Sequence, residues 1–169
     1  ATARRWHRAA AVNGRGGDFA NTPGLLTAAV LETLMAGGKG YCMWAGAYMD
    51  TRQWAELSAV NGVIADHEDT FLDGNETNLF NAYPPEGKGD YFHPYSKEVF
   101  VSTRETKTEG VVLITDYRAE RKPFWLERST AYTGPMTLID AFTGKTVAKL
   151  AANQWDFRIH LKDLPVRLL

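Results

Sequence analysis

Residues 40–45 read Gly-Tyr-Cys-Met-Trp-Ala, an unbroken run in which polar and apolar positions do not alternate. Strands that are buried on both faces show such runs, and they are typical of parallel α/β sheets. We therefore expect this stretch to be a buried strand. No other segment nearby reads as its neighbour in a parallel sheet. Either the chain is a piece of a larger protein, or its first half depends on a partner.

A helix is predicted immediately before this strand. Thr22 can accept a hydrogen bond from an unpaired backbone N–H at the helix start. Pro23 suits the first turn, where its missing N–H costs nothing. Gly37 and Gly38 end the helix, because glycine tolerates the left-handed geometry of a helix C-terminus.

A second helix is predicted after the strand, from Asp50 and Thr51 to Gly74. Asp50 and Gln53 have the spacing of a capping box, in which each side chain accepts a hydrogen bond from the backbone of the other residue. Residues 22–74 are therefore expected to form a helix–strand–helix unit.

The pattern changes after residue 74. Pro84, Pro85 and Pro94 disfavour regular structure, and we expect residues 76–96 to be a linker. From residue 97 onward, short alternating segments recur between turn signals. The strands predicted there are Lys97–Thr103, Gly110–Tyr117, Pro123–Ala131, Met136–Asp140, Thr146–Leu150 and Gln154–Leu161.

These patterns predict an α+β protein. Residues 1–75 would be an incomplete α/β segment, residues 76–96 a linker, and residues 97–169 an antiparallel β-sandwich. In the clearest strand, Trp155 shares one face with Phe157 and other apolar residues, so we expect Trp155 in the core. Trp125 alternates against apolar neighbours, and its placement stays open between the core and a sugar-binding face.

Composition excludes several classes of function. The net charge is -1 without a long run of one sign, which disfavours nucleic-acid binding. No segment approaches the roughly 18 apolar residues of a membrane span. Cys42 is the only cysteine, so no internal disulfide can form, and we expect its thiol to be buried and inert. The first residues show no signal-peptide pattern, but Ala1 could be a trimmed end, so a secreted or periplasmic location stays open.

The order of helix, buried strand, helix, linker and sandwich resembles the C-terminal part of a glycoside hydrolase, in which a (β/α)8 barrel precedes a β-sandwich. Residues 37–44 (Gly-Gly-Lys-Gly-Tyr-Cys-Met-Trp) resemble the last barrel strand, and residues 59–74 resemble the final barrel helix. Residues 138–145 resemble a hairpin of such sandwiches. The resemblance implies a partial barrel whose remaining strands, with the catalytic carboxylates, lie outside this chain.

Trp44, Tyr48 and Asp50 are the candidate substrate-binding residues. In a barrel they would follow the C-terminal end of a strand, where active sites are built. The indole of Trp44 could stack on a sugar ring or fill the barrel mouth, and Tyr48 has the same two readings. Asp50 could bind a sugar hydroxyl, but capping of the second helix is favoured.

No catalytic residue is assigned, because glycoside hydrolysis needs two carboxyl groups whose separation a sequence does not reveal. The run Asp66-His67-Glu68-Asp69 points to different faces of a helix, so we expect a charged surface turn and no metal site. No cofactor is expected. The expected partners are a carbohydrate and either the remainder of the barrel or another protein chain. The alternatives are a non-catalytic carbohydrate-binding module and a structural β-sandwich that docks a partner protein.

Overall fold

The computed structural model describes residues 22–42, 49–83, 99–118 and 121–169. The helices come first along the chain, and the strands follow. The elements are α2 (Leu25–Met35), α3 (Thr51–Asp66), α4 (Glu68–Asp73), β1 (Asn75–Thr77), β2 (Phe80–Tyr83), β3 (Val99–Glu105), β4 (Gly110–Asp116), β5 (Phe124–Arg128), β6 (Met136–Ile139), β7 (Thr146–Leu150), β8 (Asp156–Ile159) and β9 (Val166–Leu168).

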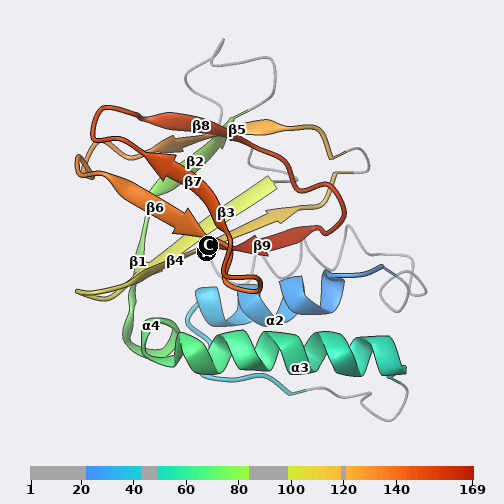
Figure 1. Ribbon diagram of the computed structural model, residues 1–169. Helices are drawn as coiled ribbons and strands as arrows, with labels where there is room; N and C mark the ends of the chain where they lie inside the picture. Colours follow the sequence, from blue (N-terminus) through green and yellow to red (C-terminus); the bar gives the residue numbers. More distant parts are fainter. Residues whose placement is uncertain (1–21, 43–48, 84–98, 119–120) are drawn as a thin grey trace.

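The elements are arranged in layers. A sheet with the strand order β1-β3-β4-β9 has the sheet β2-β5-β8 on one side and the helices on the other, with α2 lying between that first sheet and α3 (Figure 1). The hairpin β6–β7 stands beside these sheets, and the strand pairs are antiparallel. The α+β class with a sandwich-like part is therefore confirmed.

Strand β4 joins two hydrophobic cores. Val111 and Leu113 face the helices, whereas Val112 and Ile114 face the second sheet. Successive side chains of a strand point to opposite faces, so a strand covered on both sides must be apolar at every position. The unbroken apolar pattern that predicts a buried strand is thus realised in the middle of β4.

All six strands predicted after residue 96 are present, with ends that differ by a few residues. The segment expected to be a linker, residues 76–96, contains most of β1 and all of β2, and these strands pair with β3 and β5. Phe80 of β2 packs edge-on against Phe157 at 6.0 Å between ring centroids. The prolines and glycines that follow β2 in the sequence mask the short alternation of β1 and β2. Residues 84–98 lie outside the described residues.

Helix α2 ends as expected but begins later. The N–H groups of Gly37 and Gly38 donate to the carbonyls of Leu34 and Thr33, which is a Schellman motif. Gly37 has a φ of 90°. The predicted cap at Thr22 is wrong, because the helix begins at Leu25 and no side chain of its N-cap residue bonds to it.

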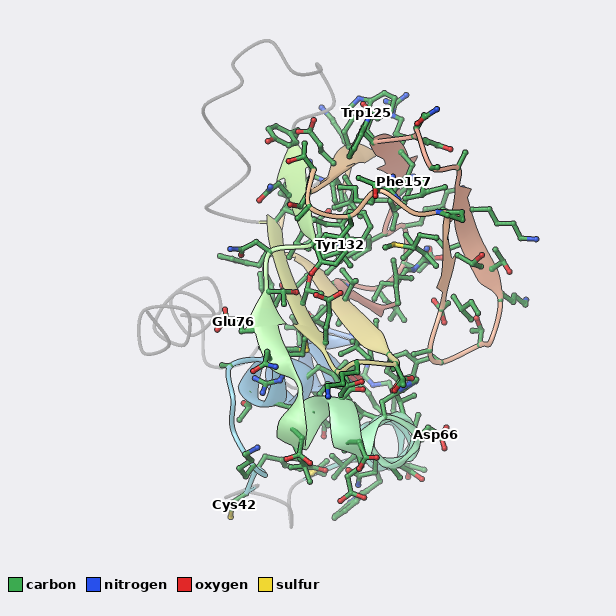
Figure 2. The ribbon with its side chains drawn as sticks, turned by 90° about the vertical axis from the view of Figure 1, so that its left-hand side faces the viewer. Cys42, Asp66, Glu76, Trp125, Tyr132 and Phe157 are labelled. Carbon is green, nitrogen blue, oxygen red and sulfur yellow. The ribbon has the colours of Figure 1, made fainter. Side chains whose placement is uncertain are left out.

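Of the strand expected at residues 40–45, the structure describes residues 40–42. Residues 40–42 form no strand, and Cys42 is exposed, so the expectation of a buried thiol is wrong. Figure 2 shows Cys42 at the end of the molecule opposite Trp125. Tyr41 donates a hydrogen bond of 2.5 Å to Asn61 of α3. Among the described residues, no strand lies beside this segment to pair with it, and residues 43–45 lie outside them.

Candidate functional site

Asp50 occupies the N-cap position of α3. Its Oδ1 accepts a hydrogen bond from the N–H of Gln53 at 2.7 Å, and Gln53 Oε1 accepts one from the N–H of Asp50 at 2.9 Å. The predicted capping box is confirmed. Trp44 and Tyr48 lie outside the described residues, so the structure places only Asp50 of the three candidates.

A groove that the sequence did not indicate opens between the helices and the end of the sandwich. Its volume is about 570 Å³. The start of α2 and the middle of α3 form one wall, and the turn after β6 and the segment around β9 form the other. The lining residues are Pro23, Gly24, Thr27, Glu56, Ala59, Asp140, Phe142, Thr143, His160, Leu161, Lys162, Asp163, Leu164, Val166 and Arg167.

Two carboxylates of this groove are already engaged by the fold. Glu56 Oε1 accepts hydrogen bonds from the backbone N–H and the hydroxyl of Thr27, at 2.8 and 2.9 Å. Asp140 accepts from the N–H and hydroxyl of Thr143, both at 2.9 Å, and pairs with Arg167 at 3.4 Å. These contacts hold both carboxylates in place between neighbouring elements, which suits a structural role.

The same groove has an apolar rim. Phe142 and Leu164 are 37% and 47% exposed, and both line the opening. Large side chains that stay exposed beside polar groups are typical of binding surfaces. The groove therefore combines exposed apolar area with polar side chains.

Buried polar groups bind the helices to the central sheet. Glu32 of α2 accepts hydrogen bonds from Thr115 at 2.7 Å and from Tyr117 at 2.9 Å. Burial, followed by the charge of Glu32 and the hydrogen bond to it, raises the pKa of Tyr117 far above its usual value. Tyr117 thus stays a neutral donor at every ordinary pH.

Arg104 of β3 makes a second such connection. Its buried guanidinium donates to the carbonyl of Met35 at 3.4 Å and to the carbonyl of Gly74. These carbonyls lie at the ends of α2 and α4, where helices leave carbonyl groups without an internal partner. One side chain therefore holds two helix ends against the sheet.

The charged run at residues 66–69 lies at the junction of α3 and α4. His67 Nδ1 is 2.7 Å from Glu109 Oε1, and the Thr70 hydroxyl donates to Glu109 Oε2 at 2.7 Å. Partial burial alone would raise the pKa of Glu109, but the hydrogen bonds from Thr70 and His67 and the charge of His67 outweigh it and lower that pKa. In the part of the chain that is described, no group of metal-ligating side chains is found.

The two candidate tryptophans of the sandwich do not form one platform. Trp155 is 36% exposed, so the expectation of a core position is wrong. It precedes β8, and the guanidinium of Arg128 lies over its ring at 5.3 Å. Trp125 is half-buried and pairs across the sheet with Arg158. Since Phe157 and Arg158 face opposite sides, Trp125 and Trp155 belong to different faces of the sheet.

Within the described ranges, no helix is long and apolar enough to cross a membrane.

Comparison with known proteins shows a likeness in fold. The chain is similar to a noncanonic maltogenic alpha-amylase from Thermotoga neapolitana, with a TM-score of 0.50 and 9% sequence identity. The match covers 76% of this chain and 27% of the amylase chain. The fold is therefore similar to that of part of a glycoside hydrolase, and this likeness concerns the fold alone. No protein-family model and no curated protein sequence matches the chain significantly.

Proposed function

We propose that this chain is the C-terminal portion or a subunit of a carbohydrate-active enzyme that hydrolyses glycosidic bonds. Its helical part would belong to a (β/α)8 barrel, and the sandwich would brace that barrel. The catalytic carboxylates would come from polypeptide outside these residues. The chain alone would then be inactive.

The observation that carries this proposal is the helix layer on the sandwich. The sandwich covers one side of the helices, and α3 buries only Leu57, Val60 and Val63. On its remaining surface, Trp54 is 52% exposed, and the small residues Ala55 and Ala59 are exposed as well. A helix face with a large exposed aromatic beside small residues suits packing against further polypeptide.

The contacts of two carboxylates in the groove support the second half of the proposal. Glycoside hydrolysis requires an acid and a base or nucleophile on either side of the bond. In the groove, Glu56 and Asp140 are tied to Thr27 and Thr143. Such engagement favours a supply of catalytic groups from outside the chain.

The substrate would be a carbohydrate bound in part by Trp44, Tyr48 and Asp50. Capping engages Oδ1 of Asp50, and Oδ2 lies 3.9 Å from Arg52 Nη2 in an exposed ion pair. A sugar hydroxyl would donate to Oδ2 beside Arg52. Trp44 and Tyr48 would supply flat apolar faces for sugar rings.

Native mass spectrometry of the protein purified from the cells that produce it tests the proposal. We expect it either within a longer polypeptide or together with a second chain of about 200 residues or more, because (β/α)8 barrels typically contain about 250 residues. Hydrolysis of a chromogenic glycoside panel should require that additional polypeptide. Activity of the 169-residue chain by itself would refute the proposal.

The role of Trp44 is tested in the active assembly. Trp44→Ala should raise the KM for an oligosaccharide, whereas Arg158→Ala, at an exposed position of β8 on the sandwich, should leave the KM unchanged. An equal effect of both changes would indicate a loss of assembly instead of a loss of substrate contact.

The carbohydrate-binding module remains a second candidate because Phe142 and Trp155 are exposed. Sedimentation of the chain alone with insoluble polysaccharide, lost in Phe142→Ala, would favour it. A structural sandwich that docks a partner would bind the partner but no polysaccharide.

A further inference from the structure

Trp155 lies at one end of the second sheet, beside two loops of the chain. Its carbonyl accepts a hydrogen bond of 2.6 Å from the N–H of Arg128, which extends the pairing of β8 with β5. One loop, residues 129–135, follows β5, and the other, residues 151–154, leads from β7 to Trp155. Each loop contains a tight turn that is closed by a backbone hydrogen bond, of 3.1 Å in the first and 3.0 Å in the second.

The buried side chain of Arg128 connects the two loops. It is only 1% exposed. Its Nη1 donates to the carbonyl of Gly134 at 2.6 Å, and its Nη2 donates to the carbonyl of Ala152 at 3.0 Å. Its guanidinium also lies over the Trp155 ring, 5.3 Å from the ring centroid. One side chain therefore holds both loops and the indole in fixed relative positions.

Arg128 has this position despite an electrostatic cost. Among the described residues, no carboxylate forms an ion pair with its guanidinium, and its buried Nε has no hydrogen-bond partner. A buried charge without a counter-ion opposes folding. Features that oppose stability are found mainly at functional sites. The arrangement is therefore explained better by the positioning of Trp155 than by stability.

Trp155 offers a flat apolar surface to solvent. The residue is 36% exposed. Because the guanidinium of Arg128 covers one face of the ring, the opposite face and the ring edge provide the exposed part. Within the described part of the chain, no second aromatic ring contacts it. A side chain that is already held in place loses little conformational entropy when it binds a ligand.

The two loops beside Trp155 contain no charged residue. Residues 129–135 read Ser-Thr-Ala-Tyr-Thr-Gly-Pro, and residues 151–154 read Ala-Ala-Asn-Gln. Their exposed polar side chains are Thr130, Thr133, Asn153 and Gln154. Hydroxyl and amide groups both donate and accept hydrogen bonds. These loops therefore suit a neutral ligand with hydroxyl groups, because a charged ligand would find no opposite charge on them.

We propose that Trp155 and the two loops bind a neutral oligosaccharide. The C–H groups of one sugar ring stack on the exposed indole face, and its hydroxyls exchange hydrogen bonds with the loop side chains. Arg128 is a positioning residue, because it is buried beneath the indole. The choice of a carbohydrate as the ligand rests on the proposed function.

This site is separate from the candidate substrate-binding residues. Asp50 begins α3 in the helix layer, which lies on the opposite side of the first sheet from the second sheet (Figure 1). The site would therefore hold a part of a polysaccharide that lies away from the bond being cleaved.

Tryptophan oxidation by N-bromosuccinimide, with peptide mass spectrometry as the readout, tests the proposal on the full chain. The probes are pentasaccharides of glucose, xylose and mannose. At least one of them should slow the oxidation of Trp155. Trp54, which is 52% exposed on α3, is the internal control and should oxidise at an unchanged rate. An unchanged rate at Trp155 with every pentasaccharide would overturn the proposal.

Titration calorimetry of variants with the protecting pentasaccharide measures the contribution of the indole. Trp155→Ala should weaken binding at least about tenfold, equivalent to ~1.4 kcal/mol. Trp155→Tyr keeps a flat ring and should retain most of the affinity. Ile139→Ala removes another exposed apolar side chain and should leave the affinity unchanged. An equal loss in Ile139→Ala and Trp155→Ala would contradict the assignment. If Trp155→Ala does not fold, the oxidation experiment decides.

Salt dependence and oligomeric state check the ligand class. Affinity should be the same at low and high salt, since screening weakens only interactions between charges. A strong salt dependence, or a dimer of this chain that buries Trp155, would overturn the assignment to a neutral sugar. So would binding that is lost in Phe142→Ala and kept in Trp155→Ala, because the sugar would then occupy the groove near Phe142.

These measurements distinguish a failure of this inference from a failure of the proposed function. They use the chain alone and need no hydrolysis, so a negative result at Trp155 would leave the catalytic assembly unaffected. Conversely, the absence of any additional polypeptide in native mass spectrometry would count against the enzyme assembly and leave protection of Trp155 unchanged.

Discussion

Glu56, in the middle of α3, caps the first turn of α2 by accepting hydrogen bonds from both the N–H and the hydroxyl of Thr27, at 2.8 and 2.9 Å. Helix N-termini leave backbone N–H groups without internal partners. In α2 that partner comes from another helix, because Gly24 at the N-cap has no side chain to offer. The contact therefore sets the position of α2 along α3.

Replacing this carboxylate should destabilise the chain. Glu56→Ala removes a charged acceptor from two donors, and hydrogen bonds to charged groups contribute about 1.5–3 kcal/mol. We expect a loss in that range from urea denaturation, and a smaller loss for Glu56→Gln. Glu68→Ala, at an exposed position of α4, is the control and should change stability by less than about 0.5 kcal/mol.

Loss of the Arg104 side chain should destabilise the fold more than loss of an exposed arginine of the sandwich. Arg104→Met keeps most of the apolar stem but leaves the carbonyls of Met35 and Gly74 without their donor. Unsatisfied buried groups cost about 1–3 kcal/mol each, so we expect at least ~2 kcal/mol by denaturation. Arg158→Met, at an exposed position of β8, should be nearly neutral. Equal effects would contradict the proposed link between helix ends and sheet.

Trp155 and Phe157 lie two residues apart and should respond differently. Phe157 is buried in the second core, and Phe157→Ala should cost about 3–5 kcal/mol. Trp155 is partly exposed and contacts Arg128, so Trp155→Ala should cost only about 1–2 kcal/mol, mostly the loss of a cation–π contact. Paired thermal unfolding curves would measure the difference, and a larger loss at Trp155 would place its ring in the core.

Acid should weaken the junction of α3 and α4. Because the folded-state pKa of Glu109 is lowered, its stabilising contribution is present above the unfolded pKa of about 4.5 and is lost as pH falls through the folded value. The side chain is 42% exposed, so solvent screening limits the effect to about 1 kcal/mol or less. Glu109→Gln should flatten the stability profile below pH ~4.5, measured by denaturation at several pH values. An unchanged profile would show that Thr70 and His67 contribute nothing through this carboxylate.

The sequence predicts the end of a helix correctly where that end depends on residues a few positions apart. Gly37 ends α2, and the Asp50–Gln53 pair begins α3, as the residues predict. Both features depend on contacts between residues a few positions apart. Of the candidate site, the sequence predicts the capping role of Asp50. It does not predict the groove near Phe142, because that groove joins segments more than 100 positions apart.

The sequence by itself determined the α+β class, the glycine end of α2, the capping box of α3 and the six strands predicted after residue 96, because periodicity and capping act over a few residues. Only the tertiary structure decided which apolar run is buried on both faces: β4 is covered by helices and by a second sheet, whereas residues 40–42 have no strand beside them. It also decided the short strands, the capping of α2 by Glu56 and the partial exposure of Trp155. Each of these depends on partners that are distant in the chain, and periodicity carries no information about them.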